Sequence, residues 1–290
     1  IVGFTGIVGM GAQRWLDLGY FQLQPSEVVK MTLVLALARY FHGASLEDVT
    51  RLGFLIGPFL MLVFPALLVL RQPDLGTALM LIIGGLSIFF LAGVRIWKFA
   101  LLIGSALATM PLIWMGLYGY QKRRVLVFLD PESDPLGAGY HILQSQIALG
   151  SGGLWGKGFL QGTQAHLNFL PEKQTDFIFT MLAEEFGIAG GLLLLGLYLL
   201  LVFCGFMISL RSRNQFGRLL GMGLTVTFAL YFFVNIAMVT GLIPVVGVPL
   251  PLISYGGTAL LMLLFAFGLL MSIHIHRDVR ISRRGGDDDA

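Results

Sequence analysis

Long stretches without a charged residue constrain this chain more than any other feature of its sequence. Several apolar runs extend for about 18 residues or more, which is enough for an α-helix to cross the hydrocarbon core of a membrane. Only 12% of the 290 residues are charged, whereas soluble domains are about 25% charged. The runs are continuously apolar rather than alternating, which argues against a β-barrel. The sequence therefore predicts an all-α, polytopic transmembrane helical bundle.

The apolar runs predict seven complete spans within a single transmembrane domain, residues 1–276. The fifth run is too long for one straight crossing at about 1.5 Å per residue. The glycine-rich string GIAGG, residues 187–191, predicts a break or bend within it. Residues 1–10 resemble the end of a further, truncated span. The predicted spans are residues 26–42, 53–70, 76–94, 98–117, 177–208, 217–240 and 256–275.

Basic residues are distributed unevenly between the two sets of connections. Eleven of the nineteen Lys and Arg residues lie in short segments on one side, which is cytoplasmic by the positive-inside rule. The tail, residues 277–290, belongs to that side. Residues 118–176 form a long loop on the opposite side, and long loops cross membranes largely regardless of charge. The eleven are Arg39, Arg51, Arg95, Lys98, Arg211, Arg213, Arg218, Arg277, Arg280, Arg283 and Arg284.

Polar residues from separate connections fall on the predicted outer side. Irregular, Gly- and Pro-rich backbone near membrane depth is tolerated only when it packs in protein or lines a cavity. We therefore expect these residues to meet in a groove open to the outer leaflet. No internal repeat is evident, which disfavours transporter folds built from two similar halves. The outer polar residues are Arg14, Glu27, Asp74, Asp176 and Ser254.

Asp176 stands directly before the fifth apolar run and is the strongest candidate for chemistry. A carboxylate in the first turn of a helix is favoured by the helix dipole and the free backbone N–H groups, so a structural N-cap is one interpretation. The other is a general base at the membrane boundary that takes a proton from a hydroxyl. Asp74, which opens the third span, has the same two interpretations.

Further charged residues lie within or at the edge of the apolar runs. Glu184 and Glu185 would lie about 12–13 Å beyond Asp176 on a continuous helix. Ionisable residues inside a membrane are costly and usually functional, although hydrogen bonding that supports the bundle is an equal alternative. Glu27 and Lys30 share one helix face, either as a structural ion pair or as a substrate contact.

A basic cluster, Lys122, Arg123 and Arg124, closes the fourth span. Basic side chains at helix ends commonly reach lipid headgroups. The Arg fork also suits a phosphate or pyrophosphate, so both interpretations stay open.

Several familiar site motifs are absent. The string GGLWGKG, residues 152–158, lacks the first glycine and the Ser or Thr of a phosphate loop. The acidic residues at 130–134 lack the glycine and the glutamate of a calcium loop. His141 and His166 lack metal-ligand spacing. Cys204 is the single cysteine, which excludes a disulfide within the chain.

Six strings, in order, closely resemble the SEDS family of cell-wall polymerases. Two sequence motifs, VVGVPLPLISYGG and GTQAHLNFLPE, favour the rod-shape branch, RodA, over the division branch, FtsW. The resemblance covers residues 11–276, and because the family has ten spans, this chain is expected to begin near the end of the third. The strings are GAQRWLDLG, QPSEVVK, QPDLGTALM, DPESDPLGAGYHILQSQIALGSGGLWGKG, LPEKQTDFIFTMLAEE and LIPVVGVPLPLISYGG.

The resemblance implies a peptidoglycan glycosyltransferase that polymerises lipid II at the outer face of the bacterial inner membrane during cell elongation. By motif, Asp176 matches the essential carboxylate, proposed to deprotonate the 4-hydroxyl of the acceptor sugar. Glu27 and Lys30 match a functional polar pair, and Asp74 matches another important position. The resemblance also implies a class B penicillin-binding protein as partner and assistance by a divalent cation, Mg or Mn, with no organic cofactor.

The implied leaving group is undecaprenyl diphosphate. By charge and side, we expect Arg14, Lys122, Arg123 and Arg124 to contact the diphosphate, and we expect the displacement to invert the anomeric centre. Membrane lipids are expected partners, whereas nucleic acid is not. The alternatives are a lipid-linked oligosaccharide flippase and a scaffold that only positions its penicillin-binding partner. A flippase needs ionisable residues toward both faces, whereas those in this sequence gather on the outer side.

Overall fold

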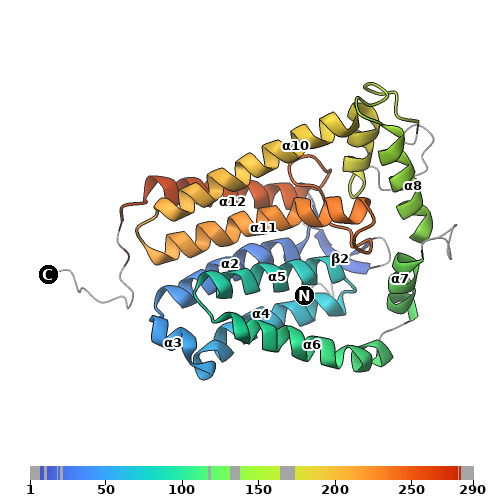
Figure 1. The fold of residues 1–290 in the computed structure, drawn as a ribbon. Coiled ribbons are helices and arrows are strands. Elements are labelled where there is room, and N and C mark those ends of the chain that lie inside the picture. The colour runs from blue at the N-terminus through green and yellow to red at the C-terminus, as the bar shows by residue number, and fades with distance from the viewer. Residues whose placement is uncertain are drawn as a thin grey trace. The chain divides into compact units, whose positions relative to one another are not determined.

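The computed structural model describes residues 7–9, 12–17, 19, 22–116, 119–130, 138–163, 174–279 and 281. Seven long helices within these ranges coincide with the seven predicted spans (Figure 1). They are α2 (Pro25–His42), α4 (Leu52–Arg71), α5 (Leu75–Leu91), α6 (Ile96–Gly116), α10 (Ile178–Arg211), α11 (Gln215–Val239) and α12 (Gly257–Ile275). The shorter elements are α3 (Leu46–Thr50), α7 (Gly119–Leu129), α8 (Ala138–Ser151), β1 (Ile7–Gly9), β2 (Ala12–Asp17) and β3 (Gln22–Leu23).

The long helices confirm a multi-pass, all-α membrane protein. Four of them, α4, α10, α11 and α12, are long and apolar enough to cross a membrane. Helix α5 and most of α6 are shorter apolar helices. Helix α2 carries Glu27, Lys30 and Arg39 within its 18 residues, so its composition is more polar than that of the other long helices.

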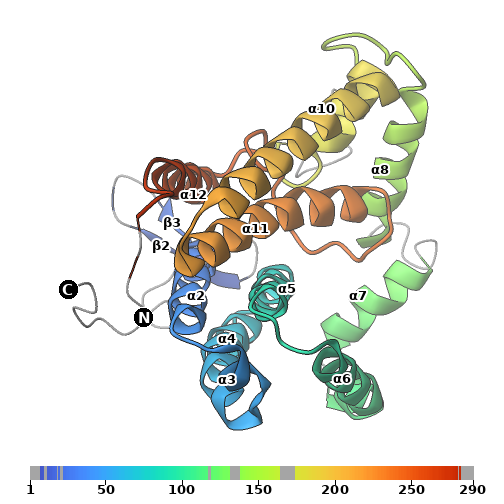
Figure 2. The same cartoon turned by 60° about the vertical axis from the view of Figure 1, so that its left-hand side comes forward.

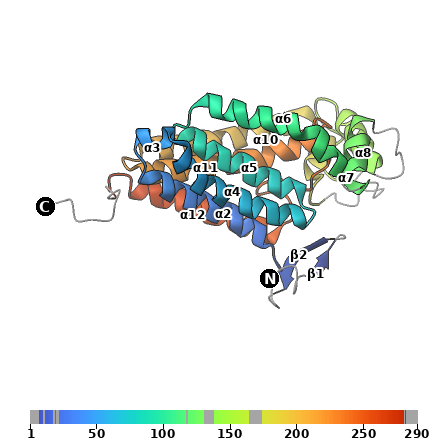
Figure 3. The ribbon, with the colours of Figure 1, turned by 90° about the horizontal axis from the view of Figure 1, so that it is seen from below.

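The N-terminal segment differs from its prediction. Strands β1, β2 and β3 form an antiparallel sheet in that order, beside the start of α2 (Figure 3). Ile7 pairs with Trp15 and Gly9 pairs with Ala12. The expected end of a helical span is therefore wrong for Ile7–Gly9, because β-branched residues beside glycine turns suit a hairpin.

The chain divides into two compact units. Unit 1 comprises residues 1–95, 200–230 and 256–290, and unit 2 comprises residues 96–199 and 231–255. The single transmembrane domain over residues 1–276 stays a prediction, as does the cytoplasmic tail, residues 277–290.

The core of unit 1 lies where α2 packs against α4, α5 and α12. Figure 2 looks nearly along α2, α4 and α5, which lie side by side. Phe41 of α2 is fully buried and meets Phe89 of α5 edge-on at 5.1 Å between ring centroids. A Cβ on Gly85 would lie only 2.5 Å from Leu62, so a glycine at this position lets α4 and α5 approach closely.

Unit 2 contains the predicted break in the fifth apolar run. Gly187 has φ 67° and ψ −167° inside α10, a conformation that glycine adopts without the steric cost of a side chain. Helix α10 is kinked at this residue. Thr180, on the segment before the break, lies 2.8 Å from the Ser145 hydroxyl of α8. The long loop at 118–176 therefore contains helices, one of which supports the start of α10.

Candidate functional site

Asp74 in unit 1 caps α5 and binds Arg14. Its Oδ1 accepts a hydrogen bond from the Thr77 backbone N–H at 3.1 Å, and its Oδ2 accepts one from the Thr77 hydroxyl at 3.0 Å. Arg14 lies 3.8 Å from Asp74 Oδ2 and donates to the carbonyls of Gln72 and Pro73. The N-cap interpretation of Asp74 is thus confirmed, and Arg14 holds the turn that precedes α5.

Glu27 and Lys30 form the predicted ion pair on α2. The Lys30 ammonium lies 2.7 Å from Glu27 Oε1, and the two side chains are only 3% and 4% exposed. A turn earlier, Gln24 donates to Asp74 Oδ2 at 3.4 Å. The structure therefore brings three predicted residues, Glu27, Lys30 and Asp74, to neighbouring positions at the starts of α2 and α5.

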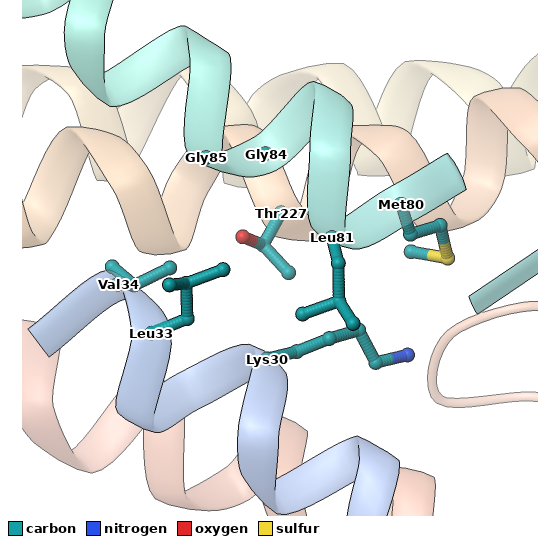
Figure 4. Close-up of a pocket in the computed structure, with 8 residues that line it drawn as sticks. All are labelled: Lys30, Leu33, Val34, Met80, Leu81, Gly84, Gly85 and Thr227. Carbon is teal, nitrogen blue, oxygen red and sulfur yellow. The ribbon is translucent and has the colours of Figure 1, made fainter. Parts of the chain in front are cut away.

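Lys30 also lines a small cavity between α2, α5 and α11 (Figure 4). Its aliphatic chain runs beside Leu81, and its ammonium points toward the Met80 side of the cavity. The volume of the cavity is about 10 Å³, which is close to the space that a single water molecule needs. This cavity is too small for a sugar or a polyprenyl chain. It is lined by Lys30, Leu33, Val34, Met80, Leu81, Gly84, Gly85 and Thr227.

Asp176 lies in unit 2, in the turn that precedes α10, and it is half-buried. Asn235 of α11 holds its backbone. The Asn235 amide nitrogen donates to the Asp176 carbonyl at 2.8 Å and to the Val248 carbonyl at 2.7 Å. A Cβ on Gly247 would lie 3.3 Å from Asp176 Oδ2, so the backbone of the loop after α11 directly faces the carboxylate.

Ser254 ties the same loop to the turn that carries Asp176. Its hydroxyl donates to the Thr175 carbonyl and accepts from the Leu250 N–H at 2.8 Å. The Tyr255 N–H donates to the Gln174 carbonyl at 2.9 Å. The structure thus places Ser254 beside Asp176, in contact with the backbone of its turn.

Tyr198 supports this loop from α10. Its hydroxyl donates to the Pro251 carbonyl at 2.6 Å, and its ring stacks on Phe232 at 5.1 Å between centroids. Side chains from α10 and α11 therefore fix both the loop and the turn around Asp176.

Glu184 is fully buried and paired in unit 2. Its Oε1 accepts hydrogen bonds from the Lys157 ammonium at 2.7 Å and from the Thr163 hydroxyl at 3.0 Å. Glu185 is half-buried, and its carbonyl accepts a hydrogen bond from the Gly158 N–H at 3.0 Å. This pairing supports the structural interpretation of Glu184.

Glycines let the GGLWGKG string pack against the backbone around Gly187. The Lys157 N–H donates to the Glu184 carbonyl, and the Ile188 N–H donates to the Gly153 carbonyl, both at 3.0 Å. A Cβ on Gly156 would lie 2.1 Å from the Glu185 carbonyl oxygen. The glycines of this string thus serve close backbone packing, in agreement with the rejection of a phosphate loop.

Fewer contacts are described for the remaining predicted residues. The Lys122 ammonium lies 3.5 Å from the Met115 carbonyl at the end of α6. The side chains of Arg123, Arg124 and His141, and all of His166, lie outside the described residues. The convergence of the unit 1 and unit 2 residues on one outer groove stays a prediction.

Sequence reasoning missed two important contacts. Asn235 was overlooked, although a carboxamide within an apolar run is a signal for interhelical hydrogen bonding. Lys157 was considered only as part of a phosphate-loop motif, and its partner Glu184 could not be inferred from spacing.

Comparisons with known proteins place these residues in a family context. The chain matches the FTSW_RODA_SPOVE family, described as cell cycle protein, over residues 1–279. It is 51% identical to the peptidoglycan glycosyltransferase MrdB of Escherichia coli, over 94% of this chain and 73% of that protein. It is 40% identical to the probable peptidoglycan glycosyltransferase FtsW of Trichlorobacter lovleyi, over 94% of this chain and 72% of that protein.

Solved structures give the same result. A chain from a peptidoglycan synthase complex that coordinates polymerization and crosslinking matches with a TM-score of 0.81 and 35% identity, covering 95% of this chain and 77% of that chain. The rod shape determining protein RodA of Thermus thermophilus matches with a TM-score of 0.67 and 30% identity, covering 95% of this chain and 73% of that chain.

Proposed function

Since the chain belongs to the FtsW/RodA/SpoVE family, we propose that it is a peptidoglycan glycosyltransferase. It polymerises lipid II into glycan strands during cell elongation. The main structural support is the arrangement around Asp176, whose turn is held by Asn235 and Ser254 and whose carboxylate faces Gly247.

Asp176 acts as the general base in this proposal. The acceptor 4-hydroxyl oxygen attacks the anomeric carbon of the donor sugar and passes its proton to the Asp176 carboxylate. The bond between the anomeric carbon and the diphosphate oxygen breaks, and undecaprenyl diphosphate departs with the electron pair. Attack opposite the leaving group inverts the anomeric centre. Diphosphate needs no protonation to leave, unlike the alcohol that glycosidases release.

A fixed backbone at Asp176 suits this role. Orienting a base against a bound reactant can contribute several kcal/mol to catalysis, on the order of 7–11 kcal/mol in the best intramolecular systems. The hydrogen bonds from Asn235 and Ser254 restrict the turn on both sides of Asp176. The carboxylate can thus be held in place before substrate arrives.

Cationic groups would stabilise the departing diphosphate. Arg14, Lys122, Arg123 and Arg124 remain our proposals for this role. A divalent cation, Mg or Mn, would neutralise charge on the diphosphate when bound. Among the described residues no group of three His, Cys, Asp or Glu gathers. Mg commonly uses one or two carboxylates together with substrate phosphates, and the described residues fit such an open site better than a closed protein cage.

We also propose the setting of the reaction. The positive-inside rule places the loop at 118–176 outside the bacterial inner membrane and the tail at 277–290 in the cytoplasm. Lipid II is the substrate, and a class B penicillin-binding protein cross-links the strands. The similarity to a chain of a complex that coordinates polymerization and crosslinking supports this partner.

Purified protein and labelled lipid II would test the proposal. Wild type should produce strands that gels resolve by length, and Asp176→Asn should abolish them because the amide cannot accept the proton. The matched control is Glu47→Gln, an exposed carboxylate on α3, which should retain activity. Lipid II transfer across vesicles without strand formation would instead favour the flippase. Wild-type activity in folded Asp176→Asn would remove the base assignment.

A further inference from the structure

The loop at residues 152–160, between α8 and the start of α10, presents an apolar outer surface. Four large side chains on it, Leu154, Trp155, Phe159 and Leu160, are between 62% and 82% exposed. Large contiguous apolar patches on a protein surface usually mark an interaction site. This loop therefore needs a partner or an apolar environment.

The single charged side chain of the loop is directed inward. Lys157 is the only ionisable residue between Gly152 and Leu160. Its ammonium lies 2.7 Å from Glu184, which is fully buried. The outer surface of the loop thus has no charge of its own to keep in water.

The loop is fixed beside the point where the long part of α10 begins. Backbone hydrogen bonds join Gly153 to Ile188 at 3.0 Å and Leu154 to Ala189 at 3.1 Å, directly after the break at Gly187. Phe159 also contacts Phe186, with 6.1 Å between ring centroids. The apolar surface of the loop consequently continues onto the first turns of the span.

That span has a lipid-facing surface. Ile188, Leu192 and Leu193 are each more than half exposed. Only 17% of the most apolar 18-residue stretch of α10 is buried in protein. In a membrane these side chains contact acyl chains. The loop surface is continuous with these side chains. The lipid that surrounds them is therefore also the nearest apolar environment for the loop.

We infer that the 152–160 loop is an interfacial membrane anchor. Leu154, Trp155, Phe159 and Leu160 insert at the boundary between lipid headgroups and acyl chains, where aromatic side chains concentrate in membrane proteins. Lys157 and the backbone hydrogen bonds transmit this position to Glu184 and the segment that follows Asp176. Insertion of this loop into the membrane does not depend on the proposed enzymatic activity. A benefit of the anchor for binding a lipid-linked substrate does rest on the proposed function.

Tryptophan fluorescence tests the anchor directly. Trp15→Phe, Trp97→Phe and Trp114→Phe together leave Trp155 as the only tryptophan. In phosphatidylcholine vesicles, its emission should be blue-shifted, protected from aqueous iodide, and quenched more by bromines near the headgroup end of the acyl chains than by bromines near their tips. As a control, adding Trp155→Phe and Glu47→Trp to the triple variant places the only tryptophan on the charged α3 connection, and this variant should show iodide quenching.

Two results would overturn the anchor. Iodide quenching without bromine quenching at Trp155 would place the loop in water. Protection from both quenchers would show that protein covers it. If the triple variant does not fold, Cys204→Ser with Phe159→Cys provides a single cysteine for a nitroxide label. Its power saturation should then show greater access to oxygen than to a water-soluble nickel chelate, and the reverse order would contradict the proposal.

Discussion

Asn235→Leu tests most directly how the protein positions Asp176. Leucine has the same branched shape as asparagine, with bulkier methyl groups, but it cannot donate to the carbonyls of Asp176 and Val248. The amide orientation is fixed because its nitrogen faces both carbonyl oxygens at 2.8 Å and 2.7 Å. The substitution therefore removes two defined hydrogen bonds while leaving little empty space.

The expected loss of stability follows from the burial of each group. Val248 is only 2% exposed, and an unsatisfied buried carbonyl costs about 1–3 kcal/mol. The half-buried Asp176 carbonyl should cost about 1 kcal/mol, because water can replace part of its hydrogen bond. Asn235 Oδ1 has no partner among the described residues, so its removal offsets about 1 kcal/mol. The net loss in unfolding free energy should be about 1–3 kcal/mol.

The loss of activity should exceed this loss of stability. A displacement near 1 Å at a reacting group can cost about 100-fold in rate, and Asn235→Leu releases the turn that holds Asp176. Thermal unfolding in detergent measures the first quantity, and strand formation from lipid II at a temperature where both proteins are folded measures the second. Asn235→Asp should be worse, because it places an acceptor or a buried charge against two carbonyls.

Thr225→Val is the matched control. Thr225 is also buried on α11, and its hydroxyl donates to the Gly221 carbonyl at 2.8 Å, away from the turn that carries Asp176. This variant should show little change in polymerisation per folded molecule. Equal activity for the two variants, at equal folded fraction, would refute the positioning argument.

Three further substitutions test other contacts. Gly247→Ala should reduce polymerisation, because Gly247 has φ +69° and its added methyl group would lie 3.3 Å from Asp176 Oδ2; lipid II assays beside thermal unfolding measure the effect. Lys157→Met should lower the unfolding free energy by about 3–5 kcal/mol, because it removes the ammonium that pairs with the buried Glu184 carboxylate, and Glu184→Gln in the same chain should restore part of the loss. Asp74→Ala should cost about 1 kcal/mol through the lost helix cap, measured by thermal unfolding.

The long helices were predictable because hydropathy and helix length are local properties. The same is true of the break in α10, where GIAGG interrupts an overlong apolar run. The predicted helix end was wrong for Ile7–Gly9, because a short apolar run fits a strand as well as a helix end. Helix α8 was not anticipated within the long loop, since its polar residues obscure its apolar side.

The candidate site was predictable where its partners are close in sequence. Glu27 and Lys30 are three residues apart, so helix geometry alone placed them together. Asn235 is 59 residues from Asp176 and comes from a different helix. No periodicity in either segment encodes that contact, because it depends on how α11 packs beside the start of α10.

These contacts suggest why Asp176 lies before the break rather than inside the long membrane helix. Asn235 and Ser254 fix the turn at one end of the segment 176–186, and Glu184, through Lys157, fixes the other end. A base for a lipid-linked sugar must be rigid and still meet water, because both the sugar and its diphosphate are strongly hydrated. A carboxylate within the long apolar part of α10 would be rigid but would carry the cost of ionisation in hydrocarbon. A short helix held at both ends, outside that part, meets both requirements.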